Sequence, residues 1–175
     1  MTRRGRAFGF VTGLTLAVWL VLSVANAPLR TEAAPAGIIS LELAGSAESA
    51  EAVIRSWGPR QREAASFGLG LDFLFLLLYP TAISLAVAMV TERLILPAPR
   101  LAHWGRTISL ALPAAAVLDA VENAALWRML QLGATDGWAR TAAVAASIKF
   151  ALVAVGLLFL PIGLALARRG PGKGS

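Results

Sequence analysis

Three polar side chains lie close together in residues 117–126, a stretch that is otherwise apolar. On a helix, Asp119 precedes Glu122 by three residues and Asn123 by four, so the three side chains share one face. Two carboxyl groups in different environments can act as general acid and base, and they can also bind a cation. An ionisable group near a bilayer centre costs about 2.5–3.5 kcal/mol by insertion scales. We therefore expect this face to point into a helix bundle.

The composition around this stretch is typical of an integral membrane protein. The chain has 175 residues, of which 57% are hydrophobic and 15% charged, and its mean hydropathy is +0.69. A helix needs about 20 apolar residues to cross about 30 Å of hydrocarbon. Four runs meet this length: residues 8–27, 67–90, 107–127 and 141–167. We predict an all-α bundle of four transmembrane helices, with residues 1–175 as one domain and residues 28–66 as its long loop.

The distribution of charge indicates topology and argues against nucleic-acid binding. The N-terminus, residues 91–106 and the C-terminus together hold nine Lys or Arg residues against one acid, Glu92, whereas the other two loops balance Arg with acids. This positive-inside pattern places both termini in the cytoplasm and residues 28–66 outside a bacterial plasma membrane. The partners expected from the charge are therefore lipid headgroups of the bilayer, and no nucleic acid.

The outer loop, residues 28–66, contains two patterned segments. In residues 37–45 apolar and polar residues alternate, which fits a short strand as well as an extended or helical piece on the membrane surface. An amphipathic helix is predicted to follow, capped by Ser46 or Ser49 and ending near Trp57. Two roles stay open for this helix: an interfacial helix with Trp57 at headgroup level, or a lid over the outer mouth of the bundle.

Two further spans carry polar residues at a similar depth. Asp72 lies near the outer start of the second span, with Tyr79 on the same helical stripe. Lys149 is the one Lys or Arg inside a predicted span. At about 1.5 Å per residue, these side chains and those of residues 119–123 all fall in the outer half of the bundle. We expect Lys149 to pair with Asp119, because unpaired buried charges are costly.

Small residues and prolines predict how the spans pack. Ala116, Ala120 and Ala124 repeat a small-xxx-small spacing that predicts a packing face on the third span. A second stripe of small residues accompanies Lys149 on the fourth span. Pro161 is expected to break the fourth span near its inner end, because proline cannot donate a backbone hydrogen bond.

These observations define a candidate ligand-binding site or polar core. Its residues are Asp72, Tyr79, Asp119, Glu122, Asn123 and Lys149. The sequence has no cysteine, no zinc-binding histidine pair, no nucleophile motif and no phosphate loop, so we expect neither metal nor cofactor. We favour a multi-pass membrane protein that binds a small polar or lipid-like ligand, as a carrier or an accessory subunit. The alternatives are an intramembrane acid/base enzyme and a structural subunit of a larger membrane complex.

Four short stretches resemble a group of small, uncharacterised bacterial four-helix integral membrane proteins. They are Gly-Ile-Ile-Ser-Leu-Glu-Leu-Ala-Gly at residues 37–45, Ile54-Arg-Ser-Trp57, Leu71-Asp-Phe-Leu-Phe75 with Tyr79, and Leu118-Asp-Ala-Val-Glu-Asn123. The resemblance extends from Ala36 to about Phe150. It implies a four-span bundle with a structured first outer loop, and it implies no particular activity. It also implies that the Glu42 segment forms one unit with Asp72 and residues 119–123.

Overall fold

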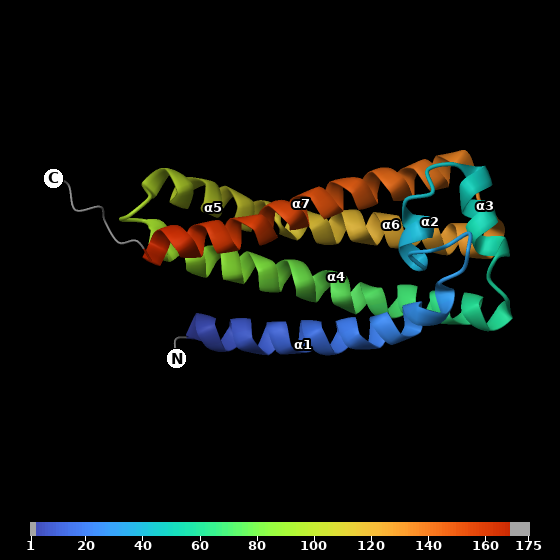
Figure 1. Ribbon diagram of the computed structural model, residues 1–175, viewed down its shortest axis with the longest axis horizontal. Helices are drawn as coiled ribbons and strands as arrows, with labels where there is room; N and C mark the ends of the chain where they lie inside the picture. The colour runs from blue at the N-terminus through green and yellow to red at the C-terminus, as the bar shows by residue number, and fades with distance from the viewer. Residues whose placement is uncertain (1–2, 169–175) are drawn as a thin grey trace.

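The computed structural model describes residues 3–168, and within this range it contains helices and no strand. The elements are α1 (Arg3–Asn26), the short 3-10 helix η1 (Ala27–Leu29), α2 (Ile38–Glu42), α3 (Ala47–Arg55), α4 (Pro59–Leu94), α5 (Pro99–Ala111), α6 (Pro113–Leu132) and α7 (Asp136–Arg168). Figure 1 shows an elongated bundle in which α1 begins and α7 ends at the same end, while α2 and α3 lie at the opposite end. The prediction of an all-α four-helix bundle is confirmed.

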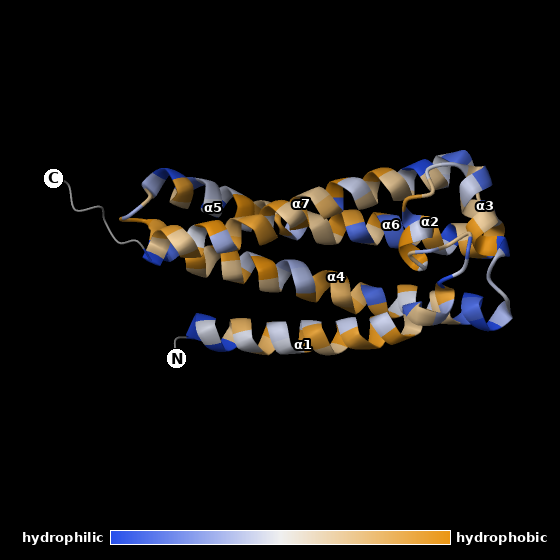
Figure 2. Ribbon diagram, in the orientation of Figure 1, coloured by the Kyte–Doolittle hydropathy of each residue, from blue (hydrophilic) through white to orange (hydrophobic). Residues whose placement is uncertain are grey.

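Four stretches of the bundle are long and apolar enough to cross a membrane. They are Arg3–Leu29, Pro59–Leu94, Pro99–Leu132 and Asp136–Arg168. Hydrophobic residues dominate the length of these helices, and hydrophilic residues gather at the two ends of the bundle (Figure 2). Large apolar side chains such as Leu77, Leu110 and Leu158 are exposed on the outside. An apolar surface of this extent is typical of a protein that faces lipid.

The third span consists of two helices that meet at Leu112 and Pro113. Pro113 lacks a backbone N–H, so it occupies the first turn of α6, where no intrahelical donor is needed. Leu112 keeps helical angles (φ −54°, ψ −37°), so α5 and α6 continue in one direction (Figure 1). Pro80 and Pro161, by contrast, lie inside α4 and α7. The prediction that Pro161 breaks the fourth span is wrong, because neighbouring helices and local adjustments allow a transmembrane helix to continue through proline.

The packing face of α6 differs from the one predicted from its alanines. Ala124 is exposed, and Ala116 and Ala120 are only partly buried, whereas Asp119 is buried. A carboxylate that faces lipid costs far more than an alanine does, so the polar face sets the rotation of α6. The predicted small-residue stripe of α7, in contrast, is buried together with Lys149.

In the half of the bundle near α5, the interior is apolar and closely packed. Its buried residues come from α4, α5, α7 and the α5–α6 junction: Val87, Val90, Leu94, Ala102, Leu112 and Phe159. Glycines allow this packing, since a Cβ added at Gly105 would overlap Thr91 Oγ1 and one added at Gly163 would lie 2.5 Å from Val90 Cγ1. These helices therefore pack together here through apolar contacts and close backbone approach.

At the opposite end, the loop of residues 28–66 folds into two helices that cover the bundle. Residues 38–42 form α2, so the short-strand interpretation of their alternation is wrong. Of the two predicted capping residues, Ser46 is the N-cap of α3, and its hydroxyl accepts a hydrogen bond from Ser49 N at 3.2 Å. The apolar face of α3 packs into a core with residues of α4, α6 and α7.

Trp57 shows how tightly this cover is attached. It is 1% exposed, and its Nε1 donates a hydrogen bond to Leu29 O at 2.8 Å. The depth of this helix relative to lipid headgroups, and its role as a lid, stay predictions. Trp57 itself lies in the protein interior, where its indole N–H finds a backbone acceptor.

Candidate functional site

Lys149 of α7 lies at the centre of a buried ionic cluster. Its Nζ donates a hydrogen bond to Asp119 Oδ1 at 2.9 Å, lies 2.7 Å from Glu122 Oε2 and lies 3.9 Å from Glu42 Oε2. Glu122 is 0% exposed and Glu42 9% exposed. The predicted pairing of Lys149 with Asp119 is confirmed, and two further carboxyl groups share the same ammonium.

Two hydrogen bonds extend the cluster along α4. Tyr79 Oη donates to Asp119 Oδ2 at 2.9 Å, and Asn123 Nδ2 donates to Asp72 Oδ2 at 2.6 Å. Phe75 packs against Tyr79 with the ring centroids 5.1 Å apart, which helps to fix the phenol. The structure thus brings together all six residues that the sequence singled out, from α4, α6 and α7.

The helical register of each element explains this convergence. On α6, the spacing of three and four residues puts Asp119, Glu122 and Asn123 on the face that points into the bundle. On α4, Asp72 and Tyr79 are seven residues apart and therefore lie on one side, two turns from each other. Because an exposed charge would face lipid on any other rotation of these helices, the polar residues themselves favour this arrangement.

Glu42 reaches the cluster through a backbone turn at the start of α2. Gly37 has φ +64°, and a Cβ there would lie 2.5 Å from Asn26 Oδ1, so only glycine fits without a shift. The same Asn26 Oδ1 accepts a hydrogen bond from Ile38 N at 2.8 Å. This contact ties α2 to the end of α1 and directs Glu42 toward Lys149.

Spacing along the predicted spans did not identify Glu42 as a site residue. Its signal in the sequence is a single acid among the apolar residues 38–43, and the family resemblance had grouped its segment with Asp72. Burial raises the pKa of the Glu42 carboxyl above its ordinary value near 4.5, and the nearby charge of Lys149 offsets this only in part. The carboxyl therefore keeps its proton to a higher pH than an exposed glutamate does.

The cluster holds more acid than base. Four carboxyl groups, those of Glu42, Asp72, Asp119 and Glu122, surround one ammonium, which gives a net charge of −3 when all are ionised. Lys149 Nζ is the cation nearest to both Glu122 Oε2 and Glu42 Oε2, and Glu122 Oε1 has no hydrogen-bond partner among the described residues. Several buried carboxyl groups that share one cation are costly, so the cluster favours an added donor.

An amphipathic cavity of about 510 Å³ borders this cluster. Its polar wall includes Glu42, Asp72, Asp119, Asn123 and Lys149. Its apolar wall includes Trp19 and Leu22 of α1, Phe75 of α4, and Phe150, Val153 and Leu157 of α7. Figure 1 shows α4 between α1 on one side and α6 and α7 on the other, with α2 near one end of this arrangement. Ligand sites commonly combine apolar walls with a few polar groups in this way.

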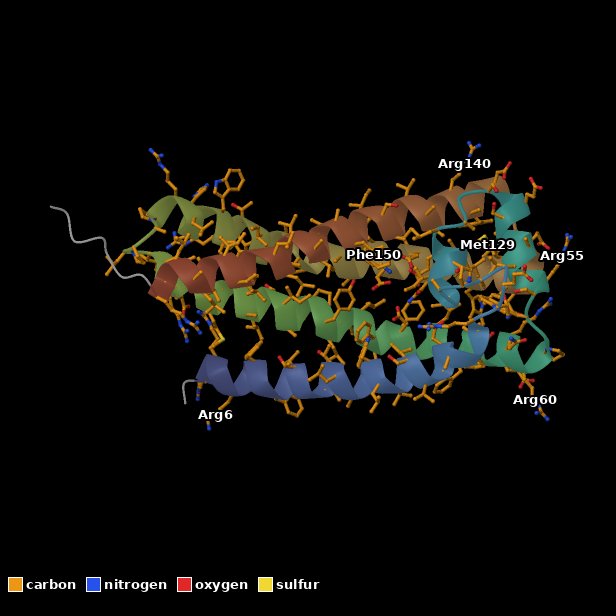
Figure 3. The ribbon with its side chains drawn as sticks, in the orientation of Figure 1. Arg6, Arg55, Arg60, Met129, Arg140 and Phe150 are labelled. Atoms are coloured by element: carbon orange, nitrogen blue, oxygen red, sulfur yellow. The ribbon has the colours of Figure 1, made fainter. Side chains whose placement is uncertain are left out.

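The cavity lies away from the ends of the bundle. Figure 3 shows Phe150, the residue after Lys149, between Arg6 at one end and Arg55, Arg60 and Arg140 at the other. Within residues 3–168, no group of three or more His, Asp or Glu residues is arranged to hold a metal ion. The carboxyl groups surround an ammonium instead.

A second cavity, of about 410 Å³, lies between α5 and α7 and reaches Leu112 at the α5–α6 junction. Leu101, Trp104, Ile108, Leu152 and Val155 are among its lining residues, and no charged residue lines it.

Comparison of the chain with models of protein families, with curated proteins and with solved structures finds no match.

Proposed function

We propose that this protein binds a small polar or lipid-like ligand in the cavity beside Lys149, as a carrier or an accessory subunit. The observation that carries this proposal is the cavity itself, whose wall combines the acidic residues Glu42, Asp72 and Asp119 with apolar side chains of α1, α4 and α7. A cavity of this size lies within the range of about 300–1,000 Å³ found for ligand pockets. A ligand with a polar head that donates hydrogen bonds and an apolar part would match both walls.

The proposed location is the plasma membrane of a bacterium, with both termini in the cytoplasm. The positive-inside distribution of Lys and Arg supports this orientation. It is also compatible with α1 beginning and α7 ending at one end of the bundle. The cavity then lies in the outer half, beneath α2 and α3.

A purely structural role for the polar network is less compatible with the geometry. A network that serves only to fix helix pairing is stable when every buried polar atom is satisfied and the space around it is filled. Here three carboxyl groups share one ammonium, and a cavity lies alongside them. Both features fit a site that is completed by a ligand.

An intramembrane acid/base enzyme is the second candidate. The observation that favours it is the contact of one ammonium with three carboxyl groups, of which Glu42 has a raised pKa. A protonated carboxyl beside an ionised one can donate and accept protons in a single reaction. If the protein is such an enzyme, the wild type converts the bound compound into a product. The variant Glu122→Gln does not form that product.

Native mass spectrometry of protein extracted gently from its own membranes tests the binding function. The comparison includes wild type, Asp72→Asn and Asp119→Asn, with Glu63→Gln as a matched control because Glu63 is exposed on α4 and does not line the cavity. We expect a discrete bound mass on the wild type and the control that falls at least about tenfold on both cavity variants, as loss of a charged hydrogen-bond partner predicts. Identical bound masses on all four proteins would contradict the proposal.

A further inference from the structure

We propose that the ligand is an amphiphile with a positively charged, amine-type head, which binds among Glu42, Asp72 and Asp119 while its apolar tail lies between α1 and α7. This inference rests on the proposed function and narrows it to one ligand class.

The charge of the polar wall selects the head group. Lys149 is already in contact with Asp119 and Glu122, and Asp72 receives one hydrogen bond, from Asn123. Asp72 and Glu42 both line the cavity, and the nearest ammonium, Lys149 Nζ, is as far as 3.9 Å from Glu42 Oε2. An ammonium brings three donors and one positive charge, so it satisfies these oxygens and reduces the net negative charge. A phosphate or carboxylate head would instead meet carboxylates on the same wall.

The apolar wall selects a tail. On α7, Phe150, Val153 and Leu157 follow at intervals of three and four residues, so they form one stripe about 10 Å long. Trp19 and Leu22 of α1 line the opposite side. A short hydrocarbon chain placed between these walls buries apolar surface along its whole length. A small cation without a tail would leave this part of the cavity without a partner of matching polarity.

The same residues indicate that the amphiphile enters sideways from the bilayer. Trp19 is 55% exposed and Leu157 is 49% exposed, although both line the cavity. The cavity is therefore open on the apolar outside of the bundle, between α1 and α7. At the end of the bundle, in contrast, Leu41 of α2 and Trp57 are buried. An amphiphile in the surrounding leaflet can reach the cluster head first without displacing α2 or α3.

Fluorescence quenching in nanodiscs of neutral phosphatidylcholine tests this inference. The probes are four compounds that carry bromine at the end of the alkyl chain: bromododecylamine, bromododecanol, bromododecanoate and bromopropylamine. Trp19 lines the apolar wall. The difference in quenching between the wild type and Trp19→Phe therefore reports how much of the cavity is occupied. The variants are Asp72→Asn and Asp119→Asn, with Glu63→Gln as the control.

We expect bromododecylamine to quench Trp19 at concentrations at least about tenfold lower than the alcohol, the carboxylate or the short amine, because loss of one charged hydrogen bond corresponds to about tenfold or more in affinity. Asp72→Asn should raise the required concentration by about tenfold, and Glu63→Gln should leave it unchanged. For the tail, Val153→Phe should weaken binding of the long amine. Val155→Phe should not, because Val155 lies on another face of α7 and does not line this cavity.

Three results would overturn the inference, and they have different meanings. Equal quenching by bromododecylamine and bromododecanol would show that the positive charge is not recognised. Equal quenching by bromododecylamine and bromopropylamine would show that the apolar tail is not recognised. In both cases the proposed binding function would stand. Quenching by all four compounds that is the same in wild type, Asp72→Asn and Asp119→Asn would reflect partition into the bilayer, and the proposed function would fail together with the inference.

Discussion

The helices α4 and α7 run through both halves of the bundle, but they are packed differently in each. In the half near α5, they contact each other and α5 through Val87, Leu94 and Phe159, with Gly105 allowing close approach. In the half near α2, the same two helices carry Asp72 and Lys149 beside a cavity. Since apolar packing holds the helices together in one half, a polar network is not needed for them to associate. The buried charges of the other half therefore favour a role in binding.

The two cavities differ in the same way. The cavity between α5 and α7 is lined without a charged residue, so it offers no group that could select among the hydrocarbon chains of the bilayer. The cavity beside Lys149 combines an apolar wall with carboxyl groups at one end. Only the second cavity can distinguish ligands by their head group, because polar groups fix orientation and specificity in otherwise apolar sites.

Removal of the central ammonium should have the largest effect on stability. Lys149→Met leaves Asp119 and Glu122 buried without a countercharge, which should lower the free energy of unfolding by about 3–5 kcal/mol. Replacing both partners, in Lys149→Met with Asp119→Leu, should recover the part of this loss that is due to Asp119, while Glu122 still lacks its ammonium. The measurement is reversible unfolding in mixed detergent micelles. A loss below about 1 kcal/mol in the single variant would mean that the carboxyl groups do not depend on Lys149.

A methyl group added in the apolar half should have the next largest effect. Gly105→Ala places a Cβ against Thr91 and Phe159, and such overpacking costs about 1–3 kcal/mol. Gly70→Ala is the matched control on α4, because nothing lies within 4 Å of its added Cβ, and it should be neutral or slightly stabilising. Equal unfolding free energies for the two variants would show that close backbone approach does not hold this half together.

Loosening the cover that α2 and α3 form over one end of the bundle should have a smaller and more local effect. Trp57→Phe removes the hydrogen bond to Leu29 O, which should cost about 1 kcal/mol. Hydrogen exchange of the α3 amides should accelerate, while exchange in α5 should not change. Trp138→Phe provides the control, since Trp138 is exposed. Unchanged exchange in α3 would contradict the account of Trp57 as the attachment of this cover.

The smallest expected effect is a pH dependence due to Glu42. Its folded-state pKa is raised above about 4.5, so the folded state binds a proton more tightly than the unfolded state. The resulting stability is fully present below the unfolded pKa and is lost as the pH rises through the folded pKa. Wild type should therefore lose stability relative to Glu42→Gln between acidic and neutral pH. If the wild type instead became more stable relative to Glu42→Gln as the pH rises, the raised pKa of Glu42 would be contradicted.

Most of the fold could be predicted from the sequence, because length and hydropathy define the helices and the cost of exposed charge orients them. The pairing of Lys149 with Asp119 followed from the same cost. The alanine stripe of α6 was misleading, since small residues permit packing but do not require it. The predicted break at Pro161 was wrong, because the effect of a proline on a transmembrane helix depends on the neighbouring helices.

The position of Glu42 and the apolar wall of α1 could not be predicted by these arguments. The position of Glu42 depends on the hydrogen bond between Asn26 and Ile38. The distance between Glu42 and Lys149 depends on the backbone turn at Gly37. Trp19 lines the cavity only because α1 packs chiefly against α4. Both features arise from contacts between segments that are separated in the chain, which periodicity within one segment does not reveal.

The most direct test of a ligand site beside Lys149 is a crystal structure of the protein purified together with its native lipids. The account predicts elongated density that starts at Glu42 and Asp72 and continues between Trp19 and Leu157. Ordered water molecules alone at the carboxyl groups, with the same lipid density in both cavities, would contradict it and would leave the polar cluster as part of the architecture.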